Sequence, residues 1–424
     1  MRILVIGGGG REHALVWKLA QSEKVTKIYC APGNPGIAKI ADCVKLDLNN
    51  LESVAEFAQA NNIDLTVVGP EATLVEGIAD VFAAKGLKVF GPSKLAARIE
   101  GSKAFAKDLM KKYNIPTAKY EVFFDAAQAK EYVKQEGAPI VIKADGLAAG
   151  KGVVVAMDEA EALAAIDSIM VDSELGQAGA SVVIEEYLEG EEASLLAFAD
   201  GKTVVPMVAA QDHKRIFDGD QGPNTGGMGT YAPAPVLTAA LRQESIDKVL
   251  IPTMAAMQAE GCPYQGCLYA GLMITDKGVK VIEFNARFGD PETQVVLPLL
   301  DGDLAEILLA CANGELDKVQ VNWKENQAAV CVVMAAQGYP ANNYKKGAVI
   351  HGLDGILEHD DIEVFHAGTG YNANEVITTG GRVLGVVGFA QGLRAAKDLA
   401  YQGVEAIHFD GAQYRKDIAW RALK

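Results

Sequence analysis

Hydrophobic and polar positions in the first hundred residues follow two alternating periods. Short apolar runs such as RILVIG (2–7) and DLTVVGPE (64–71) have the composition of buried strands, whereas LESVAEFAQANN (51–62) places its apolar residues at helical spacing. Strand-like and helix-like runs follow one another, which predicts a parallel sheet with helices on both faces. The strands end in glycine- or proline-containing loops, the edge at which open parallel sheets bind ligands.

The pattern changes after about residue 104. Strand-like runs such as PIVIKADG (139–146) and KGVVVAM (151–157) follow one another closely, which predicts mixed or antiparallel sheet. The segment 211–235 is long, polar and rich in Gly, Asp and Pro, which is typical of a loop that is either functional or disordered. From about residue 326, strand-like runs that include 406–410 alternate with turns and one helix. We therefore predict an α/β protein with three domains, at residues 1–103, 104–325 and 326–424.

The charge balance limits the classes of partner. The 424 residues contain 39 Lys and Arg against 55 Asp and Glu, a formal net charge of −16. This excess argues against a general nucleic-acid binder and against adhesion to anionic membranes. The excess falls in residues 104–325, which hold 18 basic and 34 acidic residues. A site for an anionic substrate there would depend on a few local cations.

Cellular location is predicted from what the sequence lacks. No apolar run reaches the roughly 18 residues of a membrane span, and the N-terminus has neither the basic start nor the cleavage site of a signal peptide. The six cysteines are scattered, which is typical of free thiols in a reducing compartment. We therefore expect a cytoplasmic protein that does not bind membranes.

A run of four glycines, Gly7 to Gly10, connects the first strand to the first helix. Backbone amides in such a turn approach an anion closely, and the helix dipole favours negative charge. The dinucleotide fingerprint fails, since its last glycine would fall on Glu12 or His13. An anion or sugar-phosphate site and a plain tight turn both remain open.

Two segments of the middle region have the composition of a nucleotide site. KADGLAAGKGV (143–153) combines lysines with a flexible glycine loop, although it is not a P-loop. A glycine-rich hairpin is the alternative. VVIEEYLEGEE (182–192) places several carboxylates near a strand end. It is either a solvated acidic turn or a hinge between two lobes, in which backbone groups hold a base and Glu192 takes ribose hydroxyls.

The segment KVIEFNARFGDPET (280–293) carries the strongest local signal. Glu283 and Asn285 are two apart on a predicted strand and therefore face the same way. Two oxygen donors on one face suit a hard cation that bridges phosphates. Arg287 shares that face if the strand continues. A polar edge strand is the alternative.

The segment QDHKRIFDGDQGPNTGGMG (211–229) joins Asp212, Lys214 and Arg215 to a glycine-rich run. It is typical of a loop that closes over a substrate, and a mobile surface loop is the alternative. Motifs for a serine, cysteine or zinc hydrolase are missing from the chain. An enzyme with this sequence would work by positioning phosphates and metal.

The ordered motifs identify a resemblance. GGGGREHAL, KADGLAAGKGV, IEEYLEGEE, GPNTGGMG and EFNARFGDPETQ together resemble the phosphoribosylamine–glycine ligase family of the ATP-grasp superfamily, from residue 1 to about 418. The resemblance implies a parallel N-terminal domain, a two-lobed ATP-grasp domain with a lid lobe at about 118–190, and a small C-terminal α/β domain. Another ATP-grasp carboxylate–amine ligase or a carboxylase is the alternative.

The resemblance also implies roles for individual residues. It implies contacts with ATP at Lys103, Lys143, Gly146, Gly150, Lys151, Gly152, Glu185, Glu186, Leu188 and Glu192. It implies Mg²⁺ or Mn²⁺ ligands at Glu283 and Asn285, with Gly271 where many superfamily members place a further acidic ligand. We place catalytic roles at Arg287, Lys214 and Asp212. We place substrate contacts at Gly8, Gly9, Gly10, Glu71, Arg215, Gly226, Gly227 and Asp290.

The implied reaction has two steps. The carboxylate of glycine attacks the γ-phosphate of ATP, and the amine of 5-phosphoribosylamine then attacks the resulting glycyl phosphate, as in de novo purine biosynthesis. This chemistry depends on charge neutralisation and alignment more than on a protein nucleophile. Which cations hold glycine and which hold the sugar phosphate stays open. We expect small-molecule substrates only, and a monomer or a small homo-oligomer.

Overall fold

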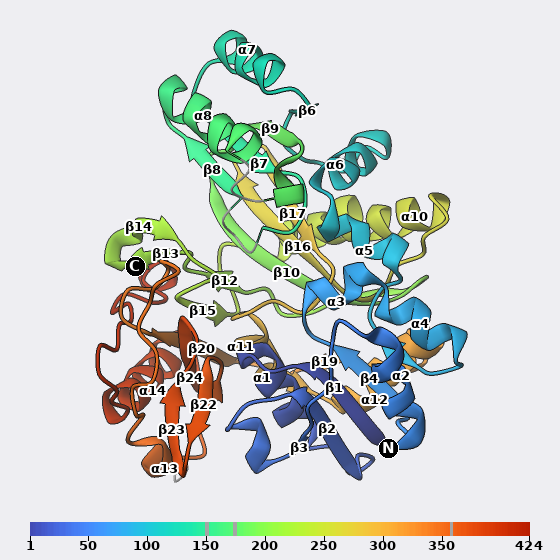
Figure 1. Cartoon of the computed structure of the whole chain (residues 1–424), viewed down its shortest axis with the longest axis vertical. Helices are drawn as coiled ribbons and strands as arrows, with labels where there is room; N and C mark the ends of the chain where they lie inside the picture. The colour runs from blue at the N-terminus through green and yellow to red at the C-terminus, as the bar shows by residue number, and fades with distance from the viewer. Residues whose placement is uncertain (149–151, 173–175, 357–358) are drawn as a thin grey trace.

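The computed structural model describes residues 1–148, 152–172, 176–356 and 359–424. Figure 1 shows a lobe that projects from a larger body, with the N-terminal and C-terminal regions side by side at the opposite end of the molecule. Gly150 and Lys151, predicted in the phosphate-binding loop, lie outside the described residues. No helix in the described residues is both long and apolar enough to cross a membrane.

The N-terminal region forms the predicted parallel sheet, in the order β3-β2-β1-β4-β5. The apolar residues of runs such as RILVIG are buried in their strands because helices cover both faces of the sheet. The strands are β1 (Arg2–Gly7), β2 (Lys27–Pro32), β3 (Asp42–Cys43), β4 (Leu65–Val68) and β5 (Val89–Phe90). The helices are α1 (Gly10–Leu19), α2 (Leu51–Ala60), α3 (Glu71–Glu76), α4 (Ile78–Ala84) and α5 (Lys94–Gly101).

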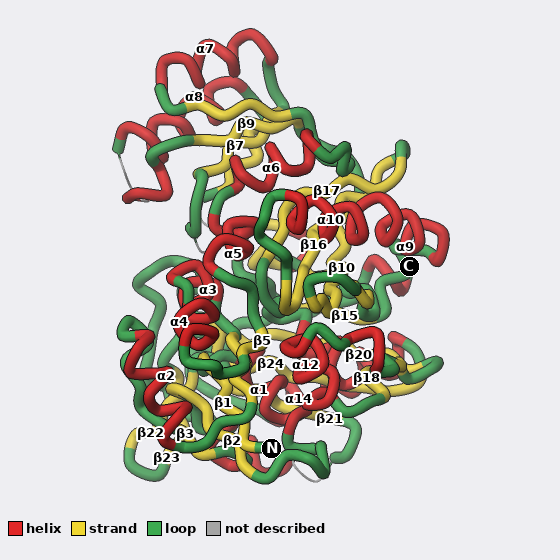
Figure 2. Tube along the Cα trace, turned by 90° about the vertical axis from the view of Figure 1, so that its right-hand side faces the viewer, coloured by secondary structure: helices red, strands yellow, loops and turns green. Residues whose placement is uncertain are grey.

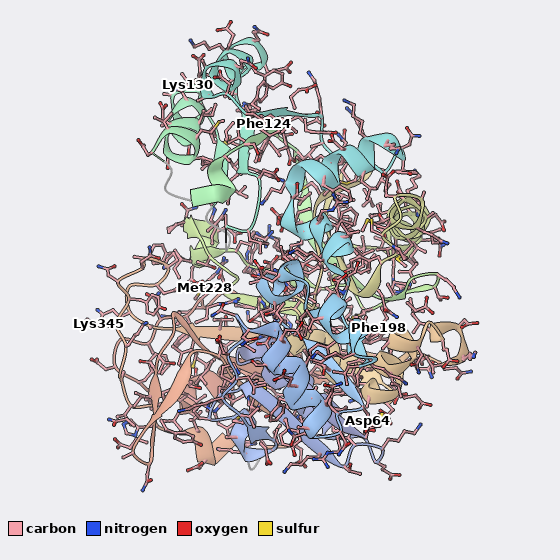
Figure 3. All side chains as sticks on the ribbon, turned by 45° about the vertical axis from the view of Figure 1, so that its right-hand side comes forward. Asp64, Phe124, Lys130, Phe198, Met228 and Lys345 are labelled. Atoms are coloured by element: carbon pink, nitrogen blue, oxygen red, sulfur yellow. The ribbon has the colours of Figure 1, made fainter. Side chains whose placement is uncertain are left out.

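Residues 120–186 form the projecting lobe, a four-stranded antiparallel sheet in the order β6-β9-β7-β8 with two helices on it (Figure 2). Aspartates at the N-caps start both helices, since Asp125 and Asp158 accept backbone N–H bonds three residues on. The elements are β6 (Tyr120–Phe123), α7 (Ala126–Glu136), β7 (Ile140–Ala144), β8 (Val153–Ala156), α8 (Glu159–Ile166) and β9 (Val182–Glu186). Figure 3 shows Phe124 and Lys130 far from Phe198, which lies in the packed body.

A second antiparallel sheet, in the order β11-β10-β16-β17, faces this lobe. Helix α6 (Lys103–Lys112) connects the N-terminal region to the lobe and is capped by Ser102. The strands are β10 (Glu191–Asp200), β11 (Val204–Pro206), β16 (Gln265–Thr275) and β17 (Gly278–Asn285). The helices of this part and the elements that follow it are α9 (Ala239–Ser245), α10 (Ile251–Ala259), α11 (Thr293–Val296), β18 (Leu300–Asp301), α12 (Leu304–Asn313) and β19 (Asn322–Trp323).

The C-terminal sheet has the order β12-β15-β20-β24-β21 and takes two of its strands from the middle of the chain. Strands β12 (Gln211–Asp212) and β15 (Gly229–Ala232) pair with each other, and β15 pairs with β20 (Gln327–Ala335). The remaining elements are α13 (Leu353–Ile356), β21 (Ile362–His366), β22 (Thr369–Asn372), β23 (Glu375–Thr378), β24 (Arg382–Gln391) and α14 (Leu393–Ala406). The middle and C-terminal regions are therefore joined through a shared sheet.

Two local predictions differ from the structure. The segment 211–235, predicted as one long loop, contains four short strands: β12 and β15 join the C-terminal sheet, and β13 (Arg215–Phe217) and β14 (Gln221–Asn224) form a hairpin between them. The strand predicted at 406–410 is wrong: α14 runs to Ala406, and His408 forms only an isolated bridge to His351. The alternation of Ile407 and Phe409 has another cause, since both pack into the C-terminal core.

Candidate active site

Four cations converge on one carboxylate between the projecting lobe and the central sheet. Glu283 lies near the end of β17, and burial alone would raise its pKa. The positive charges nearest to it instead hold the pKa of Glu283 below its ordinary value; they are Lys214, Lys143, Lys103 and Arg287. Tertiary structure thus brings together four cations that are as much as 184 positions apart in the sequence, counting from Lys103 to Arg287.

Two of the lysines near this site are buried with a glutamate between them. Lys143 on β7 lies 2.9 Å from Glu185 on β9, and Lys107 on α6 lies 2.7 Å from the other oxygen of the same carboxylate. Lys143 and Glu185 are only 3% and 4% exposed, so the pair is held away from water. Burial lowers the pKa of Lys107 to about 8, against the opposing effect of Glu185. Lys143 also donates to the carbonyl of Ile282 beside Glu283, at 3.1 Å.

Lys107 was not among the predicted residues. It stands four positions after Lys103 on α6, so both side chains share one helix face. This spacing of four is the feature of the sequence that could have indicated Lys107. Lys103 itself donates to the carbonyl of Gly146 at 2.9 Å, which joins α6 to the start of the predicted phosphate loop.

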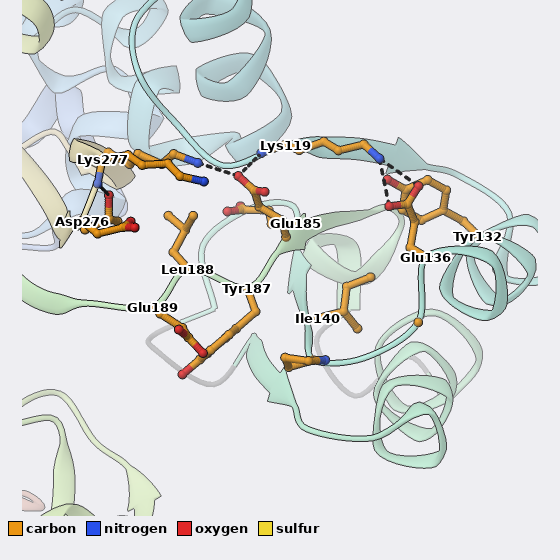
Figure 4. Close-up of a pocket in the computed structure, with 15 residues that line it drawn as sticks. Lys119, Tyr132, Glu136, Ile140, Glu185, Tyr187, Leu188, Glu189, Asp276 and Lys277 are labelled. Carbon is orange, nitrogen blue, oxygen red and sulfur yellow. Dashed lines mark hydrogen bonds and ion pairs between the residues drawn. The ribbon is translucent and has the colours of Figure 1, made fainter.

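A cavity of about 520 Å³ lies where the lobe meets the central sheet. Its lining includes Leu188, Tyr187 and Ile140, and the acidic hinge predicted from the sequence contributes Glu185 and Glu186 (Figure 4). Glu186 accepts from the backbone N–H of Lys119 at 3.0 Å and from Lys280 at 2.7 Å, so its carboxylate is fixed at the rim. The cavity has the mixed apolar and polar walls of a small-molecule site.

Glu192 begins the next part of the site. It lies near the start of β10, and its carboxylate is 2.5 Å from the ammonium of Lys214. Burial lowers the pKa of Lys214, but Glu192, Asp212 and Glu283 together raise it well above its ordinary value. Lys214 therefore stays charged between the predicted ribose-binding and metal-binding carboxylates.

Asp212 stands next to this cation in a strongly acidic environment. Burial raises the pKa of Asp212 to about 7 against the opposing effect of Lys214, and Glu292 and Glu192 add to the shift. Glu292 is itself buried and accepts a hydrogen bond from Tyr269 at 2.6 Å. Asp212 can therefore exchange a proton near neutral pH.

The predicted metal ligands lie on one strand, as their spacing of two residues predicts. Glu283 and Asn285 both belong to β17, and Gly271 is the cross-strand partner of Glu283 on β16. A Cβ at Gly271 would lie 3.3 Å from Cγ of Glu283, so a larger side chain there would crowd that carboxylate. Arg287 does not share the strand face by parity, because β17 ends at Asn285.

Arg287 is held by two carboxylates from the N-terminal region. It lies 3.2 Å from Glu71 and 2.9 Å from Glu100. Glu71 is also 3.9 Å from Arg11, which pairs with Glu12 at 2.6 Å. Glu12 accepts the backbone N–H of Gly9 at 2.7 Å. This chain of charges connects the glycine turn to the cation cluster.

The glycine turn, the predicted Asp290 and the GPNTGGMG segment meet at a second location. A Cβ on Gly9 would lie 3.6 Å from an Asp290 oxygen, and one on Gly227 would lie 2.6 Å from Pro291. A Cβ on Gly8 would lie 2.5 Å from the carbonyl of Gly33, and one on Gly10 would lie 2.6 Å from Gln294. A side chain at Gly8, Gly10 or Gly227 would therefore collide with a neighbour, since the Gly33 carbonyl, the Gln294 amide and the Pro291 ring lie so close to them.

Arg382, on β24 of the C-terminal sheet, holds this location together and was not predicted. Its guanidinium donates to the carbonyls of Gly226 at 2.5 Å and Asp290 at 2.8 Å, and lies 3.4 Å from the Asp290 carboxylate. Arg382 lies in the segment TTGGRVLGV (378–386), in which no local feature of the sequence connects it to Asp290. Arg215, predicted as a substrate contact, is exposed and donates to the carbonyl of Gly222 in its own hairpin.

Two antiparallel sheets with buried lysines between them, beside a parallel N-terminal domain, define an ATP-grasp protein. A family model described as the ATP-grasp (A) domain of phosphoribosylglycinamide synthetase matches residues 101–293. Models of the N domain and the C domain of the same synthetase match residues 1–100 and 329–421.

Individual relatives agree with these matches over the full length. A phosphoribosylamine–glycine ligase of Halalkalibacterium halodurans is 54% identical over 423 residues, which covers 100% of this chain and 97% of the relative. One from Neisseria meningitidis serogroup A is also 54% identical, over 100% of both chains. The chain belongs to the phosphoribosylamine–glycine ligase family.

Solved structures support the fold. The crystal structure of phosphoribosylamine–glycine ligase from Thermotoga maritima superposes with a TM-score of 0.86 at 33% identity, covering 98% of this chain and 100% of that chain. The biotin carboxylase domain of a 2-oxoglutarate carboxylase from Hydrogenobacter thermophilus, solved with MgADP, gives 0.74 at 18% identity, covering 97% and 91%. The second likeness concerns the fold alone.

Proposed function

We propose that this chain is an ATP-dependent ligase that joins glycine to 5-phosphoribosylamine, giving glycinamide ribonucleotide, ADP and phosphate. The observation that carries this proposal is the convergence of Lys103, Lys143, Lys214 and Arg287 on Glu283. A triphosphate and a substrate carboxylate bring several negative charges to one place, and this cluster can neutralise them. Family membership supports the choice of substrates.

In the first step, a carboxylate oxygen of glycine bonds to the γ-phosphorus of ATP while the bond to the β,γ-bridging oxygen breaks and ADP leaves. In the second step, the amine nitrogen of 5-phosphoribosylamine bonds to the acyl carbon. The carbon–oxygen bond to phosphate breaks, and the nitrogen gives up a proton. We assign charge stabilisation in the first step to Lys143, Lys214 and Arg287.

The oxygen donors of β17 suit a hard divalent cation. Glu283 and Asn285 supply two oxygens on one strand face, and Mg²⁺ in such sites is completed by substrate phosphates and water. No group of three or more His, Cys, Asp or Glu able to hold a metal is found in the described part of the chain. When bound there, Mg²⁺ or Mn²⁺ would neutralise phosphate charge.

We assign the proton acceptor of the second step to Asp212. A group with a pKa of about 7 is matched to accepting a proton at neutral pH. Glu192 and the cavity beside Leu188 would hold the nucleoside part of ATP, and the glycine turn with Gly226, Gly227 and Asp290 would hold 5-phosphoribosylamine. We also propose that the domain boundaries lie at 103/104 and 325/326.

The test is the dependence of ADP release on both co-substrates. Purified protein with ATP and Mg²⁺ should release ADP rapidly only when glycine and freshly generated 5-phosphoribosylamine are both present, and mass spectrometry should detect glycinamide ribonucleotide. Alanine in place of glycine and ammonia in place of the amine are the controls. Comparable turnover with bicarbonate or with another acid–amine pair would contradict the substrate assignment.

A further inference from the structure

The hairpin of β13 and β14 is held by a segment near the C-terminus of the chain. Figure 1 shows the C-terminus beside this hairpin, although about 200 residues separate them in the sequence. We call residues 415–421 the C-terminal segment. Its backbone N–H groups at Lys416 and Ala419 donate to Asp218 at 2.8 Å and to His213 at 3.0 Å.

Arg415 is the centre of this contact. Its side chain is 0% exposed and binds Asp417 through two nitrogens, each at 2.7 Å. Another nitrogen donates to Asp220 at 2.8 Å and to the backbone carbonyl of Arg215 at 3.2 Å. Arg421 donates to the second oxygen of Asp220 at 2.6 Å. Burying an arginine is costly unless its charge is paired, as it is here by the partly exposed Asp220 and Asp417.

These contacts hold the chain on both sides of Lys214. His213, which precedes it, is fully buried and accepts from Ala419, and Arg215, which follows it, is held through its carbonyl by Arg415. The carbonyl of Lys214 itself accepts from the backbone and the hydroxyl of Thr225, both at 2.8 Å. The Lys214 ammonium then reaches Glu192 at 2.5 Å. Its backbone position therefore depends on the C-terminal segment.

We propose that Arg415 is a positioning residue, which acts through the hairpin to hold Lys214 against Glu192 and Glu283 in the ATP site. This inference rests on the proposed role of Lys214. Arg415 does not need to touch a substrate. A buried, bidentate arginine fixes geometry more tightly than a lysine would, because its planar fork sets two hydrogen bonds at once.

The test is a double-mutant cycle between Arg415→Lys and Lys214→Ala. We measure the dissociation constant of a non-hydrolysable ATP analogue with Mg²⁺, together with kcat and KM for ATP in the ligase assay. In the wild-type background, Arg415→Lys should weaken binding of the analogue about tenfold, a coupling typical of residues in one network. In the Lys214→Ala background, the same change should alter it less than about twofold.

A core substitution separates positioning from loss of stability. Val404→Ala removes two methyl groups from a buried site on α14 in the same C-terminal core. It should lower the unfolding temperature as much as Arg415→Lys does or more, and leave the affinity for the analogue unchanged. Should Arg415→Lys fail to fold, Asp220→Asn replaces it in the cycle, because the amide keeps the size of the side chain.

An equal loss of affinity in both backgrounds, or an equal loss in Val404→Ala, would overturn the inference. Unchanged affinity in Arg415→Lys would also overturn it. The binding readout needs no ligase turnover. If the wild-type protein binds the analogue but does not join glycine to 5-phosphoribosylamine, the proposed function is contradicted. The inference on Arg415 is then still decided by the same binding cycle.

Discussion

The two ends of the candidate site are formed by different kinds of residue. At the nucleotide end, the structure buries charged side chains in pairs, such as Lys143 with Glu185. At the other end, neighbouring atoms lie so close to Gly8, Gly10 and Gly227 that a Cβ on any of them would lie 2.5–2.6 Å from another atom. The first end depends on charge, and the second depends on the lack of side chains.

This difference determines how each end should respond to mutation. A change of charge without a change of size should leave the nucleotide end folded and remove its chemistry. An added methyl group should displace the backbone at the other end and change binding there with little effect on the cation cluster. The predictions below test this division, from the largest expected effect to the smallest.

Glu283→Gln should have the largest effect at the nucleotide end. The amide keeps the shape of the side chain but removes the negative charge that Lys143, Lys214 and Arg287 share. We expect kcat to fall roughly 10²–10³-fold, the size seen when one preorganised electrostatic group is lost. Steady-state assays across a Mg²⁺ titration, with circular dichroism as the folding control, provide the measurement. Full activity at saturating Mg²⁺ would remove Glu283 from the proposed ligands.

Lys143→Ala should weaken ATP binding selectively. The ammonium lies beside the Ile282 carbonyl and Glu185, so its loss removes a cation from the phosphate region. We expect the KM for ATP to rise by roughly ten- to a hundredfold, as for loss of a charge-assisted hydrogen bond of about 1.5–3 kcal/mol. Lys143→Arg is the charge-retaining control. A change confined to the KM for glycine would contradict the placement of Lys143 beside ATP.

Gly8→Ala should show the opposite selectivity. Its Cβ would lie 2.5 Å from the carbonyl of Gly33, so the turn must shift. We expect the KM for 5-phosphoribosylamine to rise about tenfold, since a shifted turn loses roughly one good contact, while the KM for ATP stays within twofold of wild type. Gly355→Ala is the matched control, because a Cβ there meets nothing within 4 Å. Equal shifts in both KM values would break the proposed division of the site.

The pH profile should show the smallest effect. Burial raises the pKa of Asp212 to about 7, so the carboxylate is protonated below this pH and free to accept a proton above it. Turnover should therefore rise as the pH increases through about 7. In Asp212→Asn the remaining activity should lose this rising limb. A rising limb that persists unchanged in Asp212→Asn would exclude Asp212 as its source.

Local patterns were sufficient for much of the architecture. The apolar runs of the N-terminal region predicted its parallel sheet, and the predicted antiparallel character of the middle region is confirmed. The strand expected at 406–410 was wrong because an alternating pattern also arises where two residues after a helix pack into a core. Pairing of β12 and β15 with the C-terminal sheet could not be predicted, because strand partners distant in sequence leave no local signal.

Prediction of the site followed the same division. Glu283 and Asn285 could be placed on one strand face because a strand has a period of two, and Lys103, Lys143 and Lys214 were predicted from their motifs, whereas Lys107 was not. Arg382 and Arg415 were missed because their partners, Asp290 and Asp220, are 92 and 195 positions away. Their contacts depend on how the C-terminal region packs against the rest of the chain.

The sequence by itself determined the residue types, the local elements and the family of this protein, because periodicity, turn chemistry and motif order are properties of neighbouring residues. Only the tertiary structure decided which charges meet. The middle region is strongly acidic overall, yet four cations surround Glu283 because helix α6, strand β7, the turn before β13 and the segment after β17 place them there. Net charge adds over the whole chain, whereas the field at one partly buried carboxylate is set by the few charges closest to it.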